Sequence, residues 1–224
     1  MLAAVILAAG ESRRMGQPKA LLPFPETSSS KRLKETKERP AMQAAGRASP
    51  APTNGKTFLD HLVEVTKHPR VGALRVVVGA HAEEIRARVK LADECVVVNH
   101  EWEKGQLSSL QAAIRSLPAE TEAIVVCLVD HPLISAELVA SLIEAFGRTK
   151  KNIVIPTFRG RRGHPVIFPR AMFDELLTAP ADVGARAVVK AHAASVTEVA
   201  TEEEGVVMNL NDPAILQRAI ENQF

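Results

Sequence analysis

Short aliphatic runs alternate along this chain with segments of helical periodicity. The aliphatic runs cover residues 3–8, 74–78, 95–98, 123–129 and 153–155. The segments between them cover residues 58–67, 83–89, 107–116 and 136–146. In these segments apolar residues recur three and four positions apart, which predicts amphipathic helices. Continuous apolar strands that alternate with such helices are typical of a mainly parallel sheet with helices on both faces. The pattern therefore predicts a single α/β domain over residues 1–224.

Residues 25–54 break this alternation. They are rich in Ser, Pro, Ala and charged residues and contain almost no bulky apolar side chains. Such a segment cannot bury enough surface to offset the entropy lost on ordering, so we interpret it as a flexible insertion into the domain. A lid or a partner-binding segment is the alternative interpretation.

Composition narrows the class of protein. The chain of 224 residues is 46% hydrophobic and 24% charged, with a formal net charge of +2. So small a charge gives no argument for nucleic acid, and no apolar run approaches the ~20 residues of a membrane helix. Cys95 and Cys127 stand in apolar runs, which favours buried thiols and a cytoplasmic location. The apolar start could also be a secretory signal peptide, but no Lys or Arg precedes it.

Residues 7–22, LAAGESRRMGQPKALL, contain the strongest candidate for a ligand site. An apolar strand ends at Gly10, and two arginines and Lys19 follow in the same loop. A tight glycine turn after a strand can place backbone N–H groups against a polyanion, and the cations supply charge. The segment therefore predicts a site for a nucleoside triphosphate.

Two common phosphate-binding patterns do not fit this loop. A Walker A loop needs Lys and Ser or Thr after its second glycine, whereas Gln17 follows Gly16. A dinucleotide fingerprint needs a second glycine two positions after Gly10, where this chain has Ser12.

The segment instead resembles the signature L-A-A-G-x-S-x-R-M-G-x-x-K-x-L-L of MobA-like NTP transferases. The resemblance implies a three-layer α/β sandwich, that is, a Rossmann-like nucleotidyltransferase fold. It also implies that the strand end and the turn bind the nucleotide, while two cations stabilise the leaving pyrophosphate. The residues concerned are Leu7, Ala8, Ala9 and Gly10 for the nucleotide, and Arg14 and Lys19 for the pyrophosphate.

Asp130 ends the apolar run 123–129 and precedes His131 and a proline. Ligands of open α/β sheets bind at the carboxyl ends of the strands, where both Gly10 and Asp130 are expected. A carboxylate there can hold Mg²⁺, which prefers one or two carboxylates plus phosphate oxygens and water. The alternative is that Asp130 caps a helix, but Ser135 is better placed as that cap.

The run VVMNLNDPAIL, residues 206–216, is a second element of the resemblance. Relatives commonly have Asp or Asn pairs before the last helix, which implies that Asn211 is a second metal ligand and that Asn209 supports the site. Alternatively, Asn211 or Asp212 caps the final helix, with a proline in its first turn.

Residues 99–114, NHEWEKGQLSSLQAAI, are similar to a family stretch that lies around the base and ribose. The resemblance implies that Gly105 and Ser109 contact the nucleotide. On physical grounds alone, the stretch is a glycine turn followed by a serine-rich helix start. Trp102 either packs in the core or stacks on a ligand.

Residues 158–168, FRGRRGHPVIF, place several arginines in one loop before a strand. The GHP sequence resembles a motif of the MocA-like branch, which implies that His164 and Arg162 face a second, phosphorylated substrate. A solvated basic turn is the alternative, and an RNA-binding patch is the weakest interpretation because no RNA-binding module is present.

Taken together, the resemblance implies a Mg²⁺-dependent nucleotidyltransferase. Residues Ala8-Ala9-Gly10 and the GHP motif favour CTP as donor and molybdopterin as acceptor, as in a molybdenum cofactor cytidylyltransferase, with a client molybdoenzyme as a possible partner. The Asn-x-Asn motif is closer to the guanylyl branch, so GTP stays open. Two alternatives are a nucleotidyltransferase for a sugar phosphate or similar acceptor, and a non-catalytic nucleotide-binding protein that delivers cofactor.

Overall fold

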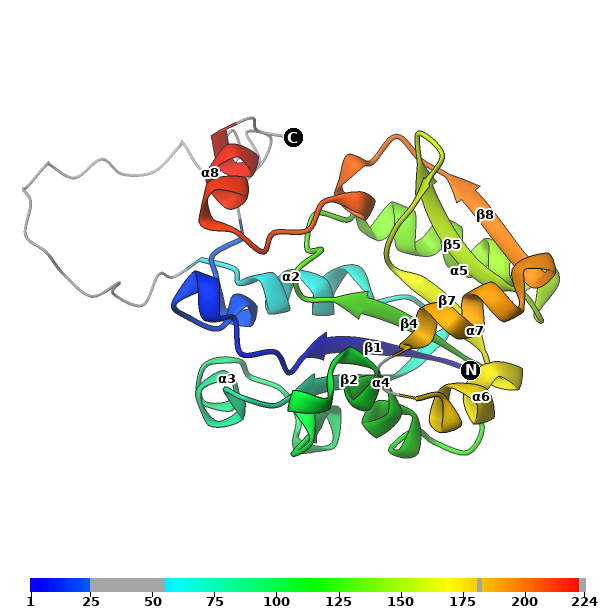
Figure 1. The fold of residues 1–224 in the computed structure, drawn as a ribbon, viewed down its shortest axis with the longest axis horizontal. Coiled ribbons are helices and arrows are strands. Elements are labelled where there is room, and N and C mark those ends of the chain that lie inside the picture. The colour runs from blue at the N-terminus through cyan, green and yellow to red at the C-terminus, as the bar shows by residue number, and fades with distance from the viewer. Residues whose placement is uncertain (25–54, 181–182, 222–224) are drawn as a thin grey trace, which may run out of the picture.

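The computed structural model describes residues 1–24, 55–180 and 183–221. Within these ranges the chain forms one eight-stranded sheet in the order β3-β2-β1-β4-β7-β5-β6, with β8 paired to β5 (Figure 1). The strands are β1 (Leu2–Ala8), β2 (Val71–Val78), β3 (Val96–Val98), β4 (Ala123–Leu128), β5 (Ile153–Phe158), β6 (Arg161–Arg162), β7 (Val166–Pro169) and β8 (Val196–Ala200). The predicted insertion, 25–54, lies outside the described residues.

Most strand pairs are parallel, as predicted. The pairs β1–β2, β1–β4, β2–β3 and β5–β8 are parallel. Strand β7 runs antiparallel between β4 and β5 and joins the two parallel groups. The prediction of a mainly parallel sheet is therefore confirmed, and β7 is its main exception. The predicted run 153–155 is too short, because β5 continues through Pro156 to Phe158.

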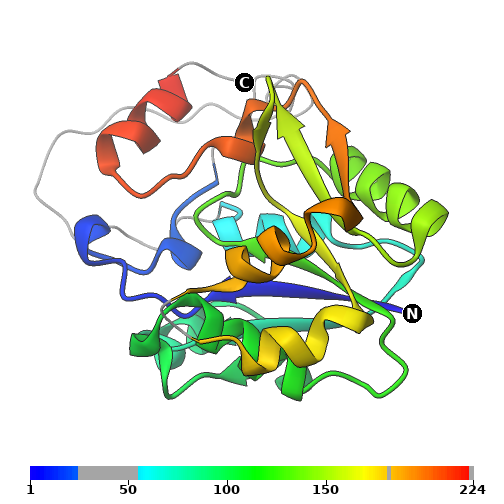
Figure 2. The same ribbon diagram turned by 45° about the vertical axis from the view of Figure 1, so that its right-hand side comes forward.

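Helices cover both faces of the sheet, so the predicted three layers are confirmed. One face packs against α2 (Phe58–Val65), α3 (Ala82–Arg88) and α5 (Ala136–Thr149). The other packs against α4 (Gln106–Arg115), α6 (Phe173–Thr178) and α7 (Ala185–Ala191) (Figure 2). All seven residues of β1 are buried; Leu2, Ile6 and Ala8 belong to one core, and Ala3, Val5 and Leu7 belong to the other, as the period of a strand requires. This double burial explains the uninterrupted apolar runs.

Local capping explains where two of these helices begin. Thr57 and Asp60 form a reciprocal capping box at the start of α2. Ser135 caps α5, as predicted, by accepting a hydrogen bond from the backbone N–H of Leu138 at 3.0 Å. The two caps fix the points at which the chain enters α2 and α5.

The residues that flank the segment 25–54 lie next to each other. The Phe24 backbone N–H donates to the Lys56 carbonyl at 2.7 Å, and the Phe58 N–H donates to the Leu22 carbonyl at 2.9 Å. Residues 22–24 and 56–58 are therefore neighbours in space.

Both cysteines are free. Cys127 is fully buried in β4, and burial raises the pKa of its thiol to about 12. Cys95 is half-buried in a single 3₁₀ turn before β3, just outside the strand predicted for it. The prediction of buried thiols is confirmed for Cys127 and holds only in part for Cys95. Separately, none of the helices within the described ranges combines the length and the apolar character needed to cross a membrane.

Candidate functional site

The ends of β1 and β4 form the floor of a cleft. The two strands are neighbours in register, with Leu7 beside Leu128, and the Val129 N–H continues the pairing by donating to the Leu7 carbonyl at 3.2 Å. The chain then leaves the sheet at Gly10 and Asp130, and both residues line a cleft of about 310 Å³. The structure therefore brings together the glycine turn and the carboxylate, as the sequence predicted.

The cleft contains every residue predicted to bind the nucleotide. These residues are Leu7, Ala8, Ala9, Gly10, Gly105 and Ser109, and Lys19 lines the cleft with them. The opposite wall comes from the turn before α4, where Gly105 has a φ of 96° that favours glycine. The side-chain amide of Asn99 donates to the hydroxyls of Ser108 and Ser109 at 2.9 and 3.0 Å. Asn99 thus fixes the orientation of this wall, a role that we did not predict.

The loop after β1 is curled by two residues with left-handed backbone. Ser12 has a φ of 55° and Gly16 a φ of 66°. A positive φ is uncommon outside glycine, and Ser12 is held there because its side-chain oxygen accepts the Lys19 backbone N–H at 3.1 Å. The short helix η2 (Lys19–Leu21) follows, and its Ala20 and Leu21 side chains are buried. The backbone of Lys19 is therefore anchored, whereas Arg14 lies exposed in η1 (Arg13–Met15).

Lys19, Asp130 and Asn211 meet at the edge of the cleft. The Lys19 ammonium lies 3.7 Å from Asp130 Oδ2 and donates a hydrogen bond to Asn211 Oδ1. Burial lowers the pKa of Lys19, the Asp130 carboxylate opposes this effect, and the cation of Arg14 adds to it. Lys19 and Asn211 are 192 positions apart in the chain, yet they share one small polar centre with Asp130.

The C-terminal segment brings Asn211 to this centre. The Leu210 backbone N–H donates to the Asp130 carbonyl at 2.7 Å, and the Leu210 side chain is fully buried. The helix α8 (Pro213–Glu221) follows, and its Ile215 and Leu216 pack in the same apolar cluster as Leu22. Asp212 caps α8, because its carboxylate accepts the Ala214 N–H at 2.8 Å. The two interpretations of this motif therefore apply to neighbouring residues: Asp212 caps the helix, and Asn211 accepts a hydrogen bond from Lys19, which also pairs with Asp130.

The oxygen atoms of this centre suit a hard divalent cation. Asp130 supplies a carboxylate and Asn211 an amide oxygen, and the buried Oδ1 of Asn209 has no hydrogen-bond partner. Across the described parts of the chain, no three His, Cys, Asp or Glu side chains form a ready-made metal cluster. One carboxylate with neutral oxygens fits Mg²⁺ that is shared with phosphate groups better than a metal held by protein alone.

The GHP motif lies behind Asp130, in the break between β6 and β7. A Cβ at Gly163 would come within 2.2 Å of the Val206 carbonyl oxygen, so only glycine permits this approach. The His164 N–H donates to the same carbonyl at 2.9 Å. The rings of His131 and His164 lie 5.2 Å apart, and the Nδ1 atom of each is buried without a partner. These two imidazoles lie near the Asp130 carboxylate, but neither lines the cleft.

Burial keeps both imidazoles neutral near pH 7. It lowers the pKa of His131, against the opposing charge of Asp130. It lowers the pKa of His164 to about 4, with further contributions from His131 and from the Arg186 cation in α7. Arg186 is therefore a cation close to His164.

Arg162 lies apart from this centre. Its Nε donates to Glu198 Oε1 on β8 at 2.7 Å, across the intervening strand β5. The predicted basic loop is a tight hairpin in which Arg161 and Arg162 form β6, with Arg159 at a φ of 48° in the turn. We predicted a shared role for His164 and Arg162 because they are two positions apart in one loop of the sequence. In the structure the break between β6 and β7 separates their surroundings.

Comparison with known proteins agrees with this geometry. The sequence pattern of the MobA-like NTP transferase domain matches residues 4–38 and 49–196. The chain belongs to the MobA-like NTP transferase family. Its resemblance to that family is thus confirmed, and it is a nucleotidyltransferase by family.

Two curated relatives of this MobA-like domain carry different names. A probable molybdenum cofactor guanylyltransferase of Mycobacterium avium (strain 104) is 28% identical over 223 residues, which are 96% of this chain and 93% of that protein. Nicotine blue oxidoreductase of Paenarthrobacter nicotinovorans is 28% identical over 194 residues, which are 83% of this chain and 80% of that protein.

A solved structure shares the fold along the whole chain. Rv0371c from Mycobacterium tuberculosis H37Rv superposes with a TM-score of 0.75 at 25% identity, covering 98% of this chain and 97% of that chain. The same protein has been solved in complex with manganese, with a TM-score of 0.70 at 24% identity and 98% coverage of both chains.

One further residue of the MobA-like domain shapes the cleft from behind. A Cβ at Gly79, directly after β2, would lie 2.6 Å from the Ala9 carbonyl oxygen and 2.7 Å from the Cβ of Trp102. The next residue, Ala80, donates its N–H to the same Ala9 carbonyl at 3.1 Å. Gly79 therefore lets Ala9 and Trp102 approach each other, and Trp102 both packs in the core and lines the cleft. A glycine directly after an apolar run was the signal for this role in the sequence.

Proposed function

We propose that this protein transfers CMP from CTP to the phosphate group of molybdopterin or its molybdenum-bound form, and releases pyrophosphate. The observation that carries the proposal is the meeting of Lys19, Asp130 and Asn211 beside a cleft formed by the backbone after β1. Its volume of about 310 Å³ is within the range of small-molecule sites.

In this mechanism an oxygen of the acceptor phosphate forms a bond to the α-phosphorus, while the bond from that phosphorus to pyrophosphate breaks. A phosphate monoester is largely dianionic at neutral pH, because its second pKa is about 6, so no strong general base is needed. The chain supplies position and charge instead. Backbone N–H groups near Gly10 would hold the phosphates, and Lys19 and Arg14 would neutralise charge on the departing pyrophosphate.

Asp130 and Asn211 would hold Mg²⁺, with Asn209 beside them, and the bound ion would neutralise charge on the phosphate oxygens. The fit rests on the oxygen donors of this centre and on the unpartnered Oδ1 of Asn209. An amide ligand carries no charge, so this site should hold the metal weakly unless the triphosphate is bound with it.

The preference for a pyrimidine rests on the wall made by Ala9. Its methyl group packs beside Gly79 and Trp102, where it takes up space that a glycine would leave free. A narrower pocket favours cytosine over guanine. GTP is the alternative donor, in keeping with the name of the mycobacterial relative.

The acceptor would approach from the side of the two imidazoles. His164 is the candidate contact from the GHP motif, and Arg186 adds a cation near it. A role for Arg162 requires that its guanidinium leave Glu198. The partner would be a molybdoenzyme that receives the product. The location would be the cytoplasm, because its reducing conditions keep free thiols such as these two unpaired.

The decisive test measures pyrophosphate release with CTP, GTP, UTP and dTTP, each with Mg²⁺, against molybdopterin and against a panel of sugar phosphates. We expect CTP with molybdopterin to give the highest kcat/KM. Preference for UTP or dTTP with a sugar phosphate would overturn the acceptor assignment. No release with any pair would favour a protein that binds nucleotide or delivers cofactor without catalysis. Redox turnover of nicotine blue in place of pyrophosphate release would instead match the name of the Paenarthrobacter relative.

A further inference from the structure

The ammonium of Lys19 lies where a metal ion would find its protein ligands. It donates a hydrogen bond to the Oδ1 atom of Asn211 and forms an ion pair with Asp130, whose Oδ2 is 3.7 Å away. Both charged side chains are largely shielded, with exposed fractions of 16% for Lys19 and 20% for Asp130. The chain's own cation therefore engages both of the oxygen ligands that the proposed function assigns to Mg²⁺.

Lysine and a divalent cation compete for such oxygens. An ammonium group has three donors and no acceptor, so it can bind Asp130 and Asn211 but cannot ligate a metal while it is charged. A metal ion at the same oxygens would be in contact with a like charge, with Arg14 as a second cation nearby. One occupant must leave before the other can bind well.

The structure also shows which part of Lys19 can move. Its backbone is held by Ser12 and by the burial of Ala20 and Leu21 in the same short helix. Its four-carbon side chain ends in a compact charge that can turn toward another anion without any change in the loop. The triphosphate, which the same cleft would hold, offers that anion.

We propose that Lys19 closes the Asp130–Asn211 pair to metal in the free protein and opens it when the triphosphate draws the ammonium away. This inference rests on the proposed function. It makes Lys19 the residue that couples the binding of metal and nucleotide, in addition to its role in neutralising pyrophosphate. Coupling of this kind is reciprocal: nucleotide strengthens metal binding by the same factor by which metal strengthens nucleotide binding.

The test uses Mn²⁺ as the probe, counted by the EPR signal of the free ion, with the full-length protein. It compares wild type with Lys19→Met, which keeps the length of the side chain without its charge, and with Lys19→Arg, which keeps the charge. Lys56→Met is the matched control, because Lys56 forms an ion pair with Glu64 away from the cleft. Asp130→Asn removes the carboxylate, and thermal unfolding shows that each variant is folded.

We expect wild type to bind Mn²⁺ weakly by itself, and Lys19→Met to bind it at least about 10-fold more tightly, within the usual range of coupling of 5–150-fold. Lys19→Arg and Lys56→Met should stay within about threefold of wild type. With the α,β-methylene analogue of CTP, and after correction for Mn²⁺ bound by free analogue, wild type should gain affinity and Lys19→Met should gain much less.

The failures of the two proposals are distinguishable. If Asp130→Asn weakens Mn²⁺ binding but folded Lys19→Met leaves it unchanged, the metal site stands. The proposal that Lys19 closes this site to metal is then overturned. If Asp130→Asn has no effect on Mn²⁺ binding with the analogue present, the metal site of the proposed function is wrong. The proposal that Lys19 closes that site is then wrong as well.

Discussion

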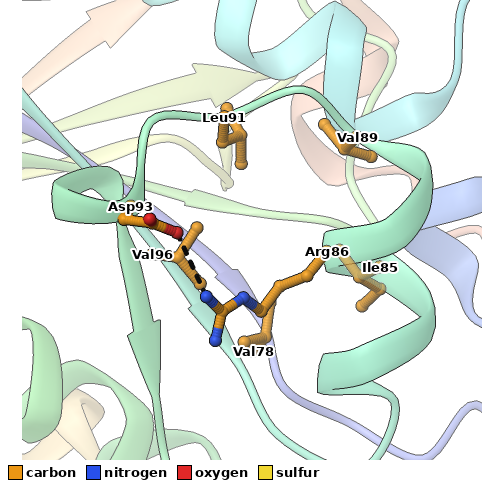
Figure 3. Close-up of a pocket in the computed structure, with 7 residues that line it drawn as sticks. All are labelled: Val78, Ile85, Arg86, Val89, Leu91, Asp93 and Val96. Carbon is orange, nitrogen blue, oxygen red and sulfur yellow. Dashed lines mark hydrogen bonds and ion pairs between the residues drawn. The ribbon is translucent and has the colours of Figure 1, made fainter.

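Two hollows in this protein differ in size and in origin. The cleft at the ends of β1 and β4 measures about 310 Å³. It is lined by Lys19, by Asp130 and by the loop that follows β1. A second hollow, between α3 and β3, measures about 40 Å³ (Figure 3). Its walls are aliphatic, and one ion pair, from Arg86 to Asp93 at 3.1 Å, lies along it.

The difference shows where this fold can hold a ligand. The small hollow is a gap in packing beside a three-residue edge strand, and its mainly aliphatic walls offer few polar partners to a ligand. The cleft lies instead where parallel strands end and their polar backbone groups are released from the sheet. Both hollows contain a carboxylate beside a cation, so an ion pair alone does not mark a functional site.

Matched carboxylate variants test this comparison with the largest effect. Asp130→Asn should lower kcat/KM for nucleotidyl transfer by about 10²–10³-fold, because it removes one preorganised electrostatic group. Asp93→Asn, at the small hollow, should leave the rate unchanged. Steady-state pyrophosphate release measures both, and comparable rates for the two variants would remove Asp130 from the site.

A methyl group added behind the cleft should have the next largest effect. Gly79→Ala must displace the Ala9 backbone or Trp102, and overpacking of this kind costs about 1–3 kcal/mol of stability. Because both neighbours line the cleft, KM for the nucleotide should rise more than kcat falls. Gly55→Ala is the control, since a Cβ there meets no atom within 4 Å. Urea unfolding and initial rates give the two quantities, and an unchanged KM would show that the wall does not contact nucleotide.

Acid should destabilise the protein through the buried imidazole of His164. His164 takes up a proton at a pKa of about 4 when folded and near 6.5 when unfolded, so the unfolded chain binds more protons between these values. Stability should therefore fall as the pH drops through this window, by about 2 kcal/mol between pH 8 and pH 5 for this group.

His164→Gln should lose that much less stability over the same change of pH, as measured by urea unfolding at each pH. His100→Gln, a change at an exposed imidazole, should behave like wild type. Equal acid sensitivity of His164→Gln and wild type would show that His164 is not the group that titrates.

The ion pair at the small hollow should matter least. Arg86 and Asp93 are exposed, with exposed fractions of 44% and 92%, so Arg86→Ala should change the free energy of unfolding by less than about 1 kcal/mol. The rate of nucleotidyl transfer should not change. A large loss of activity would mean that α3 is coupled to the cleft in a way that the contacts do not show.

Much of the fold could be predicted because β1, β4, β5 and the last three residues of β2 are buried, and continuous apolar runs reveal such strands. Strand β8 escaped the prediction because every residue of VTEVA is half-buried or exposed, as expected at the edge of a sheet. The turn at Gly10 and the carboxylate of Asp130 could be placed together because both follow parallel strands. Arg162 could not be placed, because closeness in sequence does not show on which side of a β-break a side chain lies.

By itself, the sequence determined the class of the fold and placed a glycine turn and an acid at two strand ends, since these depend on local periodicity and on residue types within single segments. Only the tertiary structure decided that Asn211 joins Asp130 through Lys19, that Gly79 holds Ala9 against Trp102, and that Asp212 rather than Asn211 caps the last helix. These contacts join residues far apart in the chain or assign neighbours to opposite sides of a turn. Packing of the buried Leu210 and the steric limit at Gly79 set them, and no local pattern records either.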